Sequence, residues 1–266
     1  MSGILPTRTV EKVWGRRTLP APFVNRTGEP VGEIWFEPTG ELDALLVKYL
    51  FTSEKLSVQC HPGDADAPAG RTGKEECWYV LEADPGAKLA IGLEREVSID
   101  ELRTAALDGS IEQLLTWHTV EAGDFFYLPA GTVHAIGPGL SLIEVQQNSD
   151  ITYRLYDYGR PRDLHLDAAL EVALRGPYDR KEHHRRVPPT GDAVLVEGPH
   201  FRLERISGRP GKSHADRFVG RCLVIPLKGR CGLADAAIEA GQCGWAESLD
   251  CVDWSESIAA LVAAPC

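Results

Sequence analysis

Short runs of strand-forming residues, each bounded by Gly, Pro or Asp, recur through the first 160 residues of this chain. The runs are rich in β-branched, aromatic or alternating apolar residues, which is typical of strands. Strands this short and closely spaced indicate a barrel or a sandwich, because alternating βαβ units would place helices between them. The sequence therefore predicts a mainly β fold, with strands at 33–36, 44–50, 56–60, 77–81, 88–91, 124–128 and 142–145.

Helical patterns interrupt this series. A small helical insertion is expected at about 98–118, because Ser98 and Ser110 each precede a Glu or Gln by three positions, as in a capping box. A further helix is expected at about 165–174, where the apolar residues fall on one face.

A charged stretch with adjacent prolines separates two β regions. We expect 179–192 to be a linker in which His183 and His184 are solvated. Strand-like runs resume at 193–197, 201–206 and 222–227. The chain is therefore expected to divide into a first domain at 1–178 and a second at 193–266.

The second region carries a faint echo of the first. Ala122-Gly123-Asp124-Phe-Phe-Tyr resembles Ala240-Gly241-Gln242-Cys-Gly-Trp, and both are expected to be turns that enter a strand. The His that follows the first copy has no counterpart after the second. We therefore expect 193–266 to form a second, degenerate barrel that holds no metal.

Composition excludes several classes of partner. A formal net charge of −11 argues against nucleic acid and anionic membranes, which require a basic face. No apolar run approaches the roughly 20 residues that span a bilayer, and the first residues do not resemble a secretory signal. The seven Cys residues form no CxxC pair and are expected to be free thiols. We expect a cytoplasmic protein that is a monomer or a weak homo-oligomer.

The most informative motif is Gly123-Asp-Phe-Phe-Tyr-Leu-Pro129-Ala-Gly131-Thr-Val-His134. Gly123 is expected to turn into a strand, and Pro129 to Gly131 to turn the chain back, so that His134 starts the next strand. An imidazole held on a rigid strand suits a metal ligand. The spacing resembles the second motif of the cupin superfamily, which implies a cupin-type β-barrel.

Two further segments supply partners for His134. Residues two apart on a strand face the same way, so Gln59 and His61 can both point into the barrel. The same alternation sends one carboxylate of the Glu75–Glu76 pair inward without selecting which. Two imidazoles, a carboxylate and an amide oxygen suit catalytic Zn²⁺, one per chain, although Mn²⁺ or Fe²⁺ would also fit.

A dense polar run follows the strand at 142–145. Glu144 lies on that strand and is expected near the barrel interior. Arg154 comes twenty positions after His134 and can return to the barrel mouth.

Together these segments resemble the type I mannose-6-phosphate isomerases of the short bacterial form. The resemblance rests on segments 56–62, 73–81, 123–137 and 146–160, with Val13-Trp-Gly and Gly32-Glu-Ile-Trp-Phe, and it weakens beyond the linker. It implies Gln59, His61, Glu76 and His134 as metal ligands, Arg154 as the essential arginine, and Lys74 and Glu144 near the sugar. Cys60 departs from the family's usual small aliphatic residue but is expected to face away from the metal.

The resemblance implies an aldose–ketose isomerase that interconverts mannose 6-phosphate and fructose 6-phosphate through a cis-enediolate. Glu144 is the hypothetical base, Arg154 and Lys74 would stabilise charge, and Ser57, Lys74 and Arg154 would bind the sugar phosphate. Two alternatives are a metal cupin of another reaction class, such as an Fe²⁺ dioxygenase, and a non-catalytic sugar-phosphate-binding or regulatory cupin.

Overall fold

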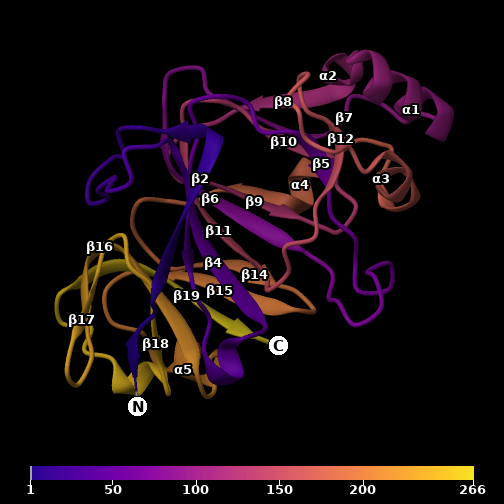
Figure 1. Cartoon of the computed structure of the whole chain (residues 1–266). Coiled ribbons are helices and arrows are strands. Elements are labelled where there is room, and N and C mark those ends of the chain that lie inside the picture. Colours follow the sequence, from indigo (N-terminus) through magenta and orange to yellow (C-terminus); the bar gives the residue numbers. More distant parts are fainter. Residues whose placement is uncertain (1) are drawn as a thin grey trace.

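The computed structural model describes residues 2–266, which form antiparallel strands in three sheets that lie one against another (Figure 1). The prediction of a mainly β, cupin-type fold is confirmed. No helix within residues 2–266 has the length and apolar character needed to cross a membrane.

The first sheet, called here the central sheet, contains strands from the first 186 residues. Its strands are β2 (Thr7–Arg16), β3 (Val31–Phe36), β4 (Leu45–Phe51), β6 (Glu76–Ala83), β9 (Asp124–Leu128), β11 (Leu140–Gln147) and β13 (His184–Arg186). They pair in the order β13-β9-β6-β11-β4-β3-β2.

The second sheet, called the outer sheet, faces the central sheet. Its strands are β5 (Val58–Cys60), β7 (Lys88–Leu93), β8 (Leu115–Thr119), β10 (His134–Ile136) and β12 (Tyr153–Tyr156), in the order β12-β5-β10-β7-β8. Buried side chains from both sheets, including Trp78, Leu89, Phe126 and Leu142, fill the space between them. These two sheets form the N-terminal barrel.

Helices cover the other face of the outer sheet, as the helical insertion predicts (Figure 1). They are α1 (Ile99–Asp108), α2 (Ile111–Leu114) and α3 (Leu166–Val172). The Ser98 hydroxyl caps α1 by accepting a 3.1 Å hydrogen bond from the backbone N–H of Glu101. Ser110 makes no such bond at the start of α2. Cys60 packs in this layer, away from the barrel interior as expected.

The third sheet, called the C-terminal sheet, contains strands from the end of the chain and one from its beginning. Its strands are β1 (Gly3–Ile4), β14 (Ala193–Glu197), β15 (Phe201–Ile206), β16 (Cys222–Gly232), β17 (Ala237–Glu239), β18 (Gly244–Ala246) and β19 (Ser257–Pro265). They run in the order β1-β18-β16-β19-β15-β14, with β17 paired to β16. The pairing of β1 with β18 joins the two ends of the sequence, which no local pattern predicted.

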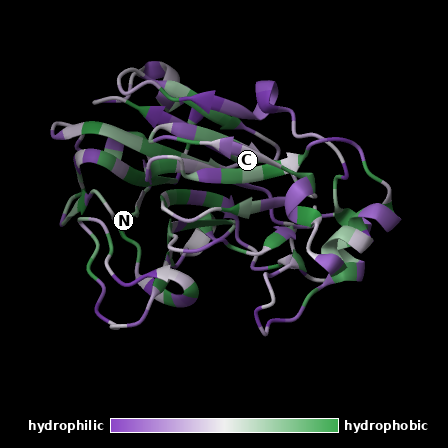
Figure 2. Ribbon diagram, turned by 90° about the horizontal axis from the view of Figure 1, so that it is seen from above, coloured by the Kyte–Doolittle hydropathy of each residue, from purple (hydrophilic) through white to green (hydrophobic). Residues whose placement is uncertain are grey.

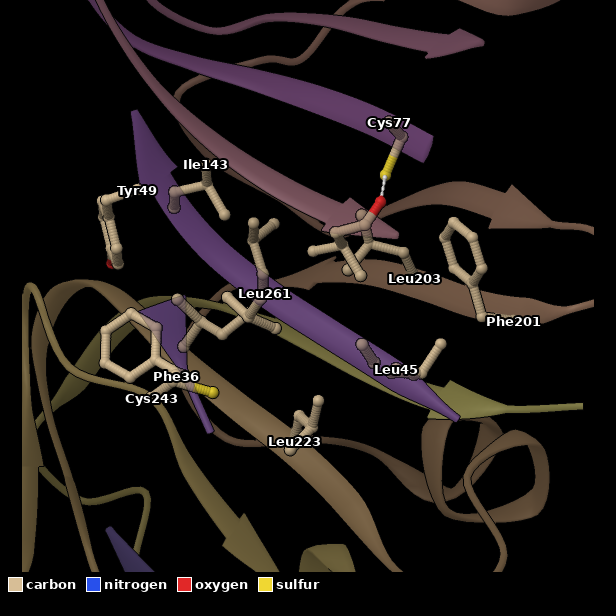
Figure 3. Close-up of a cluster of buried hydrophobic side chains, with 14 of the residues drawn as sticks. Phe36, Leu45, Tyr49, Cys77, Ile143, Phe201, Leu203, Leu223, Cys243 and Leu261 are labelled. Carbon is tan, nitrogen blue, oxygen red and sulfur yellow. Dashed lines mark hydrogen bonds between the residues drawn. The ribbon is translucent and has the colours of Figure 1, made fainter. Parts of the chain in front are cut away.

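One face of the C-terminal sheet packs directly on the central sheet. Figure 3 shows this shared core, where Leu203, Leu223 and Leu261 approach Leu45 and Ile143. The other face is covered by a second apolar cluster that extends over η2 (Leu249–Cys251) and the end of α5 (Lys212–Arg217). Apolar clusters therefore cover both faces of this sheet, and Figure 2 shows hydrophobic residues (green) interspersed with polar ones along the strands of the molecule.

The predicted linker is more ordered than expected. Residues 179–192 contain α4 (Arg180–His183) and β13, and β13 extends the edge of the central sheet by pairing with β9. The side chain of His184 is only 15% exposed, and its Nε2 lies 3.3 Å from Asp124 Oδ1. The expectation that this His is solvated was wrong, because strand pairing turns its ring onto Phe126. The division into domains at 1–178 and 193–266 stays a prediction.

Candidate metal and substrate site

The turn before β10 places His134. Gly131 adopts a φ of +80°, and a Cβ at this position would lie 2.4 Å from the Val172 carbonyl oxygen, so the turn requires glycine. The Gly131 N–H donates a 2.8 Å hydrogen bond to the His61 carbonyl, which ties the two histidine segments together. His134 starts β10 and pairs with Gln59 on the neighbouring strand.

His61 and His134 present the same ring nitrogen to the barrel interior. His61 Nδ1 lies 2.7 Å from the Ile151 carbonyl oxygen, and His134 Nδ1 lies 2.8 Å from that of Thr132. Carbonyl oxygens only accept, so each Nδ1 carries the proton and each Nε2 keeps its lone pair. In metal sites, a carbonyl oxygen that accepts from one ring nitrogen of a histidine orients the other ring nitrogen toward the metal in this way.

Glu76, the first residue of β6, completes the cluster. Its carboxylate oxygens lie 3.5 Å from Nε2 of His61 and 3.5 Å from Nε2 of His134. One ligand atom from each of these residues lies within 4.8 Å of the other two. Glu75 points the other way and bonds to Tyr127, so the structure separates the two carboxylates that alternation left unresolved.

The charge states of these groups suit a divalent cation. Burial lowers the pKa of both His61 and His134, which keeps the imidazoles neutral. Burial alone would raise the pKa of Glu76, but the charge and hydrogen bond of Lys74, together with the charge of Lys48, act against it, and the pKa is lowered. A buried anionic carboxylate between two neutral imidazole nitrogens fits Zn²⁺, and Gln59 Nε2, 3.4 Å from His134 Nε2, brings an amide beside them.

Lys74 lies within this cluster. Its Nζ is 3.0 Å from His61 Nε2 and pairs with Glu76. Burial acts to lower the pKa of Lys74, but the carboxylates of Glu76 and Glu144 raise it overall, so the amine is charged. A metal ion at His61 requires the lone pair that Lys74 contacts, so the amine and the ion cannot both occupy this position.

Glu144, on β11, lies beside the cluster with both oxygens engaged. Lys48 Nζ lies 2.9 Å from Oε1, and the Trp78 indole N–H donates a 3.0 Å bond to Oε2. Burial would raise the pKa of Glu144, but Lys48 and Lys74 lower it below its ordinary value despite Glu76. The carboxylate is therefore ionised and held in one orientation. Lys48 is itself buried.

A cavity of about 410 Å³ opens at this point of the barrel. Of the residues predicted from the sequence, it is lined by Ser57, Gln59, Lys74, Glu76, Glu144 and Arg154. Arg154 stands on β12 opposite Gln59, donates a 3.2 Å bond from Nη1 to the Asp163 carbonyl, and carries a buried Nε that has no hydrogen-bond partner among the described residues. The predicted site residues therefore meet in one place.

Several lining residues were missed, namely Lys12, Glu33, Trp35, Arg162 and His165. Glu33 and Trp35 alternate within Gly-Glu-Ile-Trp-Phe, so strand periodicity could have placed both on one face. Arg162 carried no local signal, because its bond to Asp157 depends on the turn after β12.

A His–Glu–His cluster inside an antiparallel barrel defines a cupin-type metalloprotein. No protein-family model matches the chain. Its sequence is 37% identical over 226 residues to Bacillus subtilis YvyI, assigned by its name to the mannose-6-phosphate isomerases, with 76% of this chain and 70% of that protein covered. The chain belongs to the mannose-6-phosphate isomerase family.

Other similar proteins support the same family assignment. The mannose-6-phosphate isomerase of Streptococcus mutans is 43% identical over 175 residues, covering 62% of this chain and 55% of that protein. The chain thus spans little more than half the length of that curated relative. The crystal structure of the Bacillus subtilis mannose 6-phosphate isomerase matches with a TM-score of 0.74 at 23% identity, covering 99% of both chains. A zinc-bound mannose 6-phosphate isomerase matches with a TM-score of 0.71 at 14% identity, also covering 99% of both.

Proposed function

We propose that this protein interconverts mannose 6-phosphate and fructose 6-phosphate. The observation that carries the proposal is the convergence of the His61–Glu76–His134 cluster with Lys74 and Glu144 at one cavity. The reaction named for the relatives needs a site that moves a proton between adjacent carbons and stabilises an oxyanion, and these groups are suited to both.

The proposed cofactor is one Zn²⁺ per chain, held by Gln59, His61, Glu76 and His134. The donor types, the carbonyl contacts behind both imidazoles and the zinc bound by a protein of the same fold support this choice. Such an ion would supply Lewis acidity to the sugar carbonyl.

The chain's own residues would then handle protons and charge. Glu144 is proposed to take the proton from C2 of the open-chain sugar and to return it to C1, an effect worth roughly 10² to 10⁴ in rate. Lys48 and Trp78 would keep its carboxylate aimed at the sugar. Lys74 and Arg154 would offset the negative charge of the cis-enediolate.

Recognition of the substrate is proposed to rest on local positive charge in an acidic protein. Arg154 and Lys74 line the cavity with Lys12 and Arg162, and Ser57 adds a hydroxyl. Charge-assisted hydrogen bonds from such groups suit a phosphate. We also propose a cytoplasmic location, which the seven free cysteines support, and a monomer or weak homo-oligomer.

A coupled assay of mannose 6-phosphate conversion tests the proposal, run on the purified protein, after chelation and after adding back Zn²⁺, Mn²⁺ or Fe²⁺. We expect activity that the chelator removes and Zn²⁺ restores. Binding of mannose 6-phosphate without turnover under any metal would favour a non-catalytic binding protein. Oxygen consumption with Fe²⁺ would favour a cupin of another reaction class.

A further inference from the structure

The turn between β14 and β15 carries a residue of the C-terminal sheet into the N-terminal barrel. His200, whose side chain is 24% exposed, turns both ring nitrogens toward carboxylates of the barrel. Its Nδ1 lies 3.6 Å from Asp64 Oδ2, and its Nε2 lies 3.9 Å from Glu75 Oε1. The same Nδ1 lies 3.3 Å from the side-chain amide of Gln147.

These partners hold the backbone that leads into the metal cluster. The Gln147 side chain accepts a 2.8 Å bond from the Glu75 N–H, and the Gln147 N–H donates a 3.0 Å bond to the Glu75 carbonyl. Asp64 accepts a 2.7 Å bond from the Gly73 N–H and a 3.0 Å bond from the Gln147 amide. His200 therefore closes a ring of polar contacts around residues 73–75.

These polar contacts around residues 73–75 can affect the metal cluster because successive side chains of an extended segment point to opposite sides. Glu75 points toward the C-terminal sheet, whereas its neighbours Lys74 and Glu76 point into the cavity. A shift of Glu75 is therefore transmitted to the residues on either side of it. Metal and catalytic groups tolerate only small displacements, of about 0.5 Å.

Electrostatics favours the same arrangement. Asp64 and Glu75 face the imidazole of His200 from its two ring nitrogens, and Tyr127 also bonds to Glu75. The Gly73 N–H and the Gln147 amide lower the pKa of Asp64, with a smaller contribution from His200, so this carboxylate is ionised. With Nδ1 accepting from the Gln147 amide, the His200 ring carries a proton on Nε2, which faces Glu75, and a hydrocarbon side chain provides neither group.

We propose that His200 is a positioning residue through which the C-terminal sheet holds the backbone of residues 73–75, and with it the Glu76 carboxylate, in place for metal binding. The expected effect of His200 on metal affinity depends only on the His61–Glu76–His134 cluster. Its expected effect on turnover rests on the proposed function. The C-terminal sheet would thus contribute to the site without touching the substrate.

The test compares His200→Ala, His200→Gln and a matched control, His118→Ala, in the full-length chain. His118 lies on β8 with its Nε2 3.4 Å from the Ile91 carbonyl oxygen, and it makes no contact with the ring around residues 73–75. Zn²⁺ affinity is measured by competition with a chelating dye, kcat and KM by the coupled assay, and folding by thermal unfolding.

For His200→Ala we expect Zn²⁺ affinity to fall roughly tenfold, as when an outer-shell partner is lost. In the zinc-saturated protein kcat/KM should also fall, because a shift of residues 74–76 displaces the Lys74 amine, which is proposed both to bind the sugar phosphate and to offset the charge of the enediolate. His200→Gln keeps an amide that can accept from Gln147 and donate to Glu75, so it should recover most of the loss.

Unchanged Zn²⁺ affinity in a folded His200→Ala variant would overturn the proposal, and so would an equal loss in His118→Ala. If the unsubstituted protein lacks isomerase activity but His200→Ala still weakens Zn²⁺ binding, the proposed function fails and the positioning role stands. If the unsubstituted protein is active and His200→Ala matches it in affinity and kcat/KM, only the positioning role fails.

Discussion

The N-terminal barrel and the C-terminal sheet are both antiparallel β structures, but they bury different chemistry. The barrel interior holds ionised pairs, Lys48 with Glu144 and Lys74 with Glu76, at side-chain exposures of 7% or less. The far side of the C-terminal sheet is filled mostly by apolar residues such as Ile206, Val224 and Val262.

This difference indicates a division of labour. Burying charges costs free energy that ion pairing only partly offsets, so a reactive interior weakens the unit that contains it. Two apolar faces stabilise by burial, at about 25 cal/mol per Å² of apolar surface. Substitutions in the reactive interior of the barrel should therefore affect chemistry, whereas substitutions in the apolar faces of the C-terminal sheet should affect stability alone.

The strongest test of the contrast is His134→Ala. Removing this imidazole takes one ligand from the cluster, so we expect loss of bound Zn²⁺ and of isomerisation. Metal content by atomic spectroscopy and the coupled assay check both, with His118→Ala as the control that removes a His from the same barrel. Full activity in the His134→Ala protein would refute the site.

Glu144→Gln should separate chemistry from metal binding. The amide cannot accept the C2 proton, so we expect kcat to fall by roughly 10² to 10⁴ while Zn²⁺ is retained. The substitution also leaves Lys48 buried without its anionic partner, which should cost about 3 kcal/mol of unfolding free energy in urea titrations.

A control for Glu144→Gln is Glu112→Gln, which removes a partly exposed partner of Lys55 and should change little. If Glu144→Gln loses Zn²⁺ instead of turnover, Glu144 is a structural partner of the cluster and not the base.

The contrast also explains what the sequence could predict. Alternation and turn residues act locally, so the strand at 124–128 and the turn that presents His134 were predicted at their observed positions. Alternation also places Gln59 and Ser57 on one face, and Ser57 does donate a 2.9 Å bond to Gln59. The local sequence pattern was sufficient to predict the position of a side chain wherever that position depended on a single strand and its turn.

Contacts between distant segments could not be predicted in this way. The pairing of Lys48 with Glu144 depends on the register of β4 against β11, and the contact of His200 with Glu75 depends on how two sheets stack. The His184 side chain is partly buried because β13 pairs with the edge of β9. Each of these contacts depends on tertiary structure, which the local sequence pattern around one residue does not reveal.

In the C-terminal sheet, Leu261→Ala should lower stability about as much as Glu144→Gln but leave the chemistry of the barrel unchanged. Leu261 is fully buried on β19 in the core shared with the central sheet (Figure 3), so its truncation should cost about 3 kcal/mol. Zn²⁺ affinity of the folded protein should stay near that of the unsubstituted chain. Ile258→Ala is the matched control on the same strand, since Ile258 is 56% exposed and should lose less than about 0.5 kcal/mol. A strong loss of metal affinity in Leu261→Ala would mean that the two units are not separable in this way.

The smallest expected effect is a pH dependence of stability that arises at the edge of the barrel. Burial lowers the pKa of His184 below its ordinary value of 6.5, although its bond to Asp124 acts in the other direction. As the pH falls through 6.5 the unfolded chain takes up a proton at this His before the folded protein does, so its contribution to stability is complete above pH 6.5 and is lost below it. His184→Gln cannot titrate, so the difference in thermal unfolding temperature between the two proteins should change as the pH falls from 7.5 to 5.5, to the disadvantage of the unsubstituted chain. A constant difference over this range would mean that His184 has the same pKa in both states, and that the ordered segment at β13 imposes no cost on its charged form.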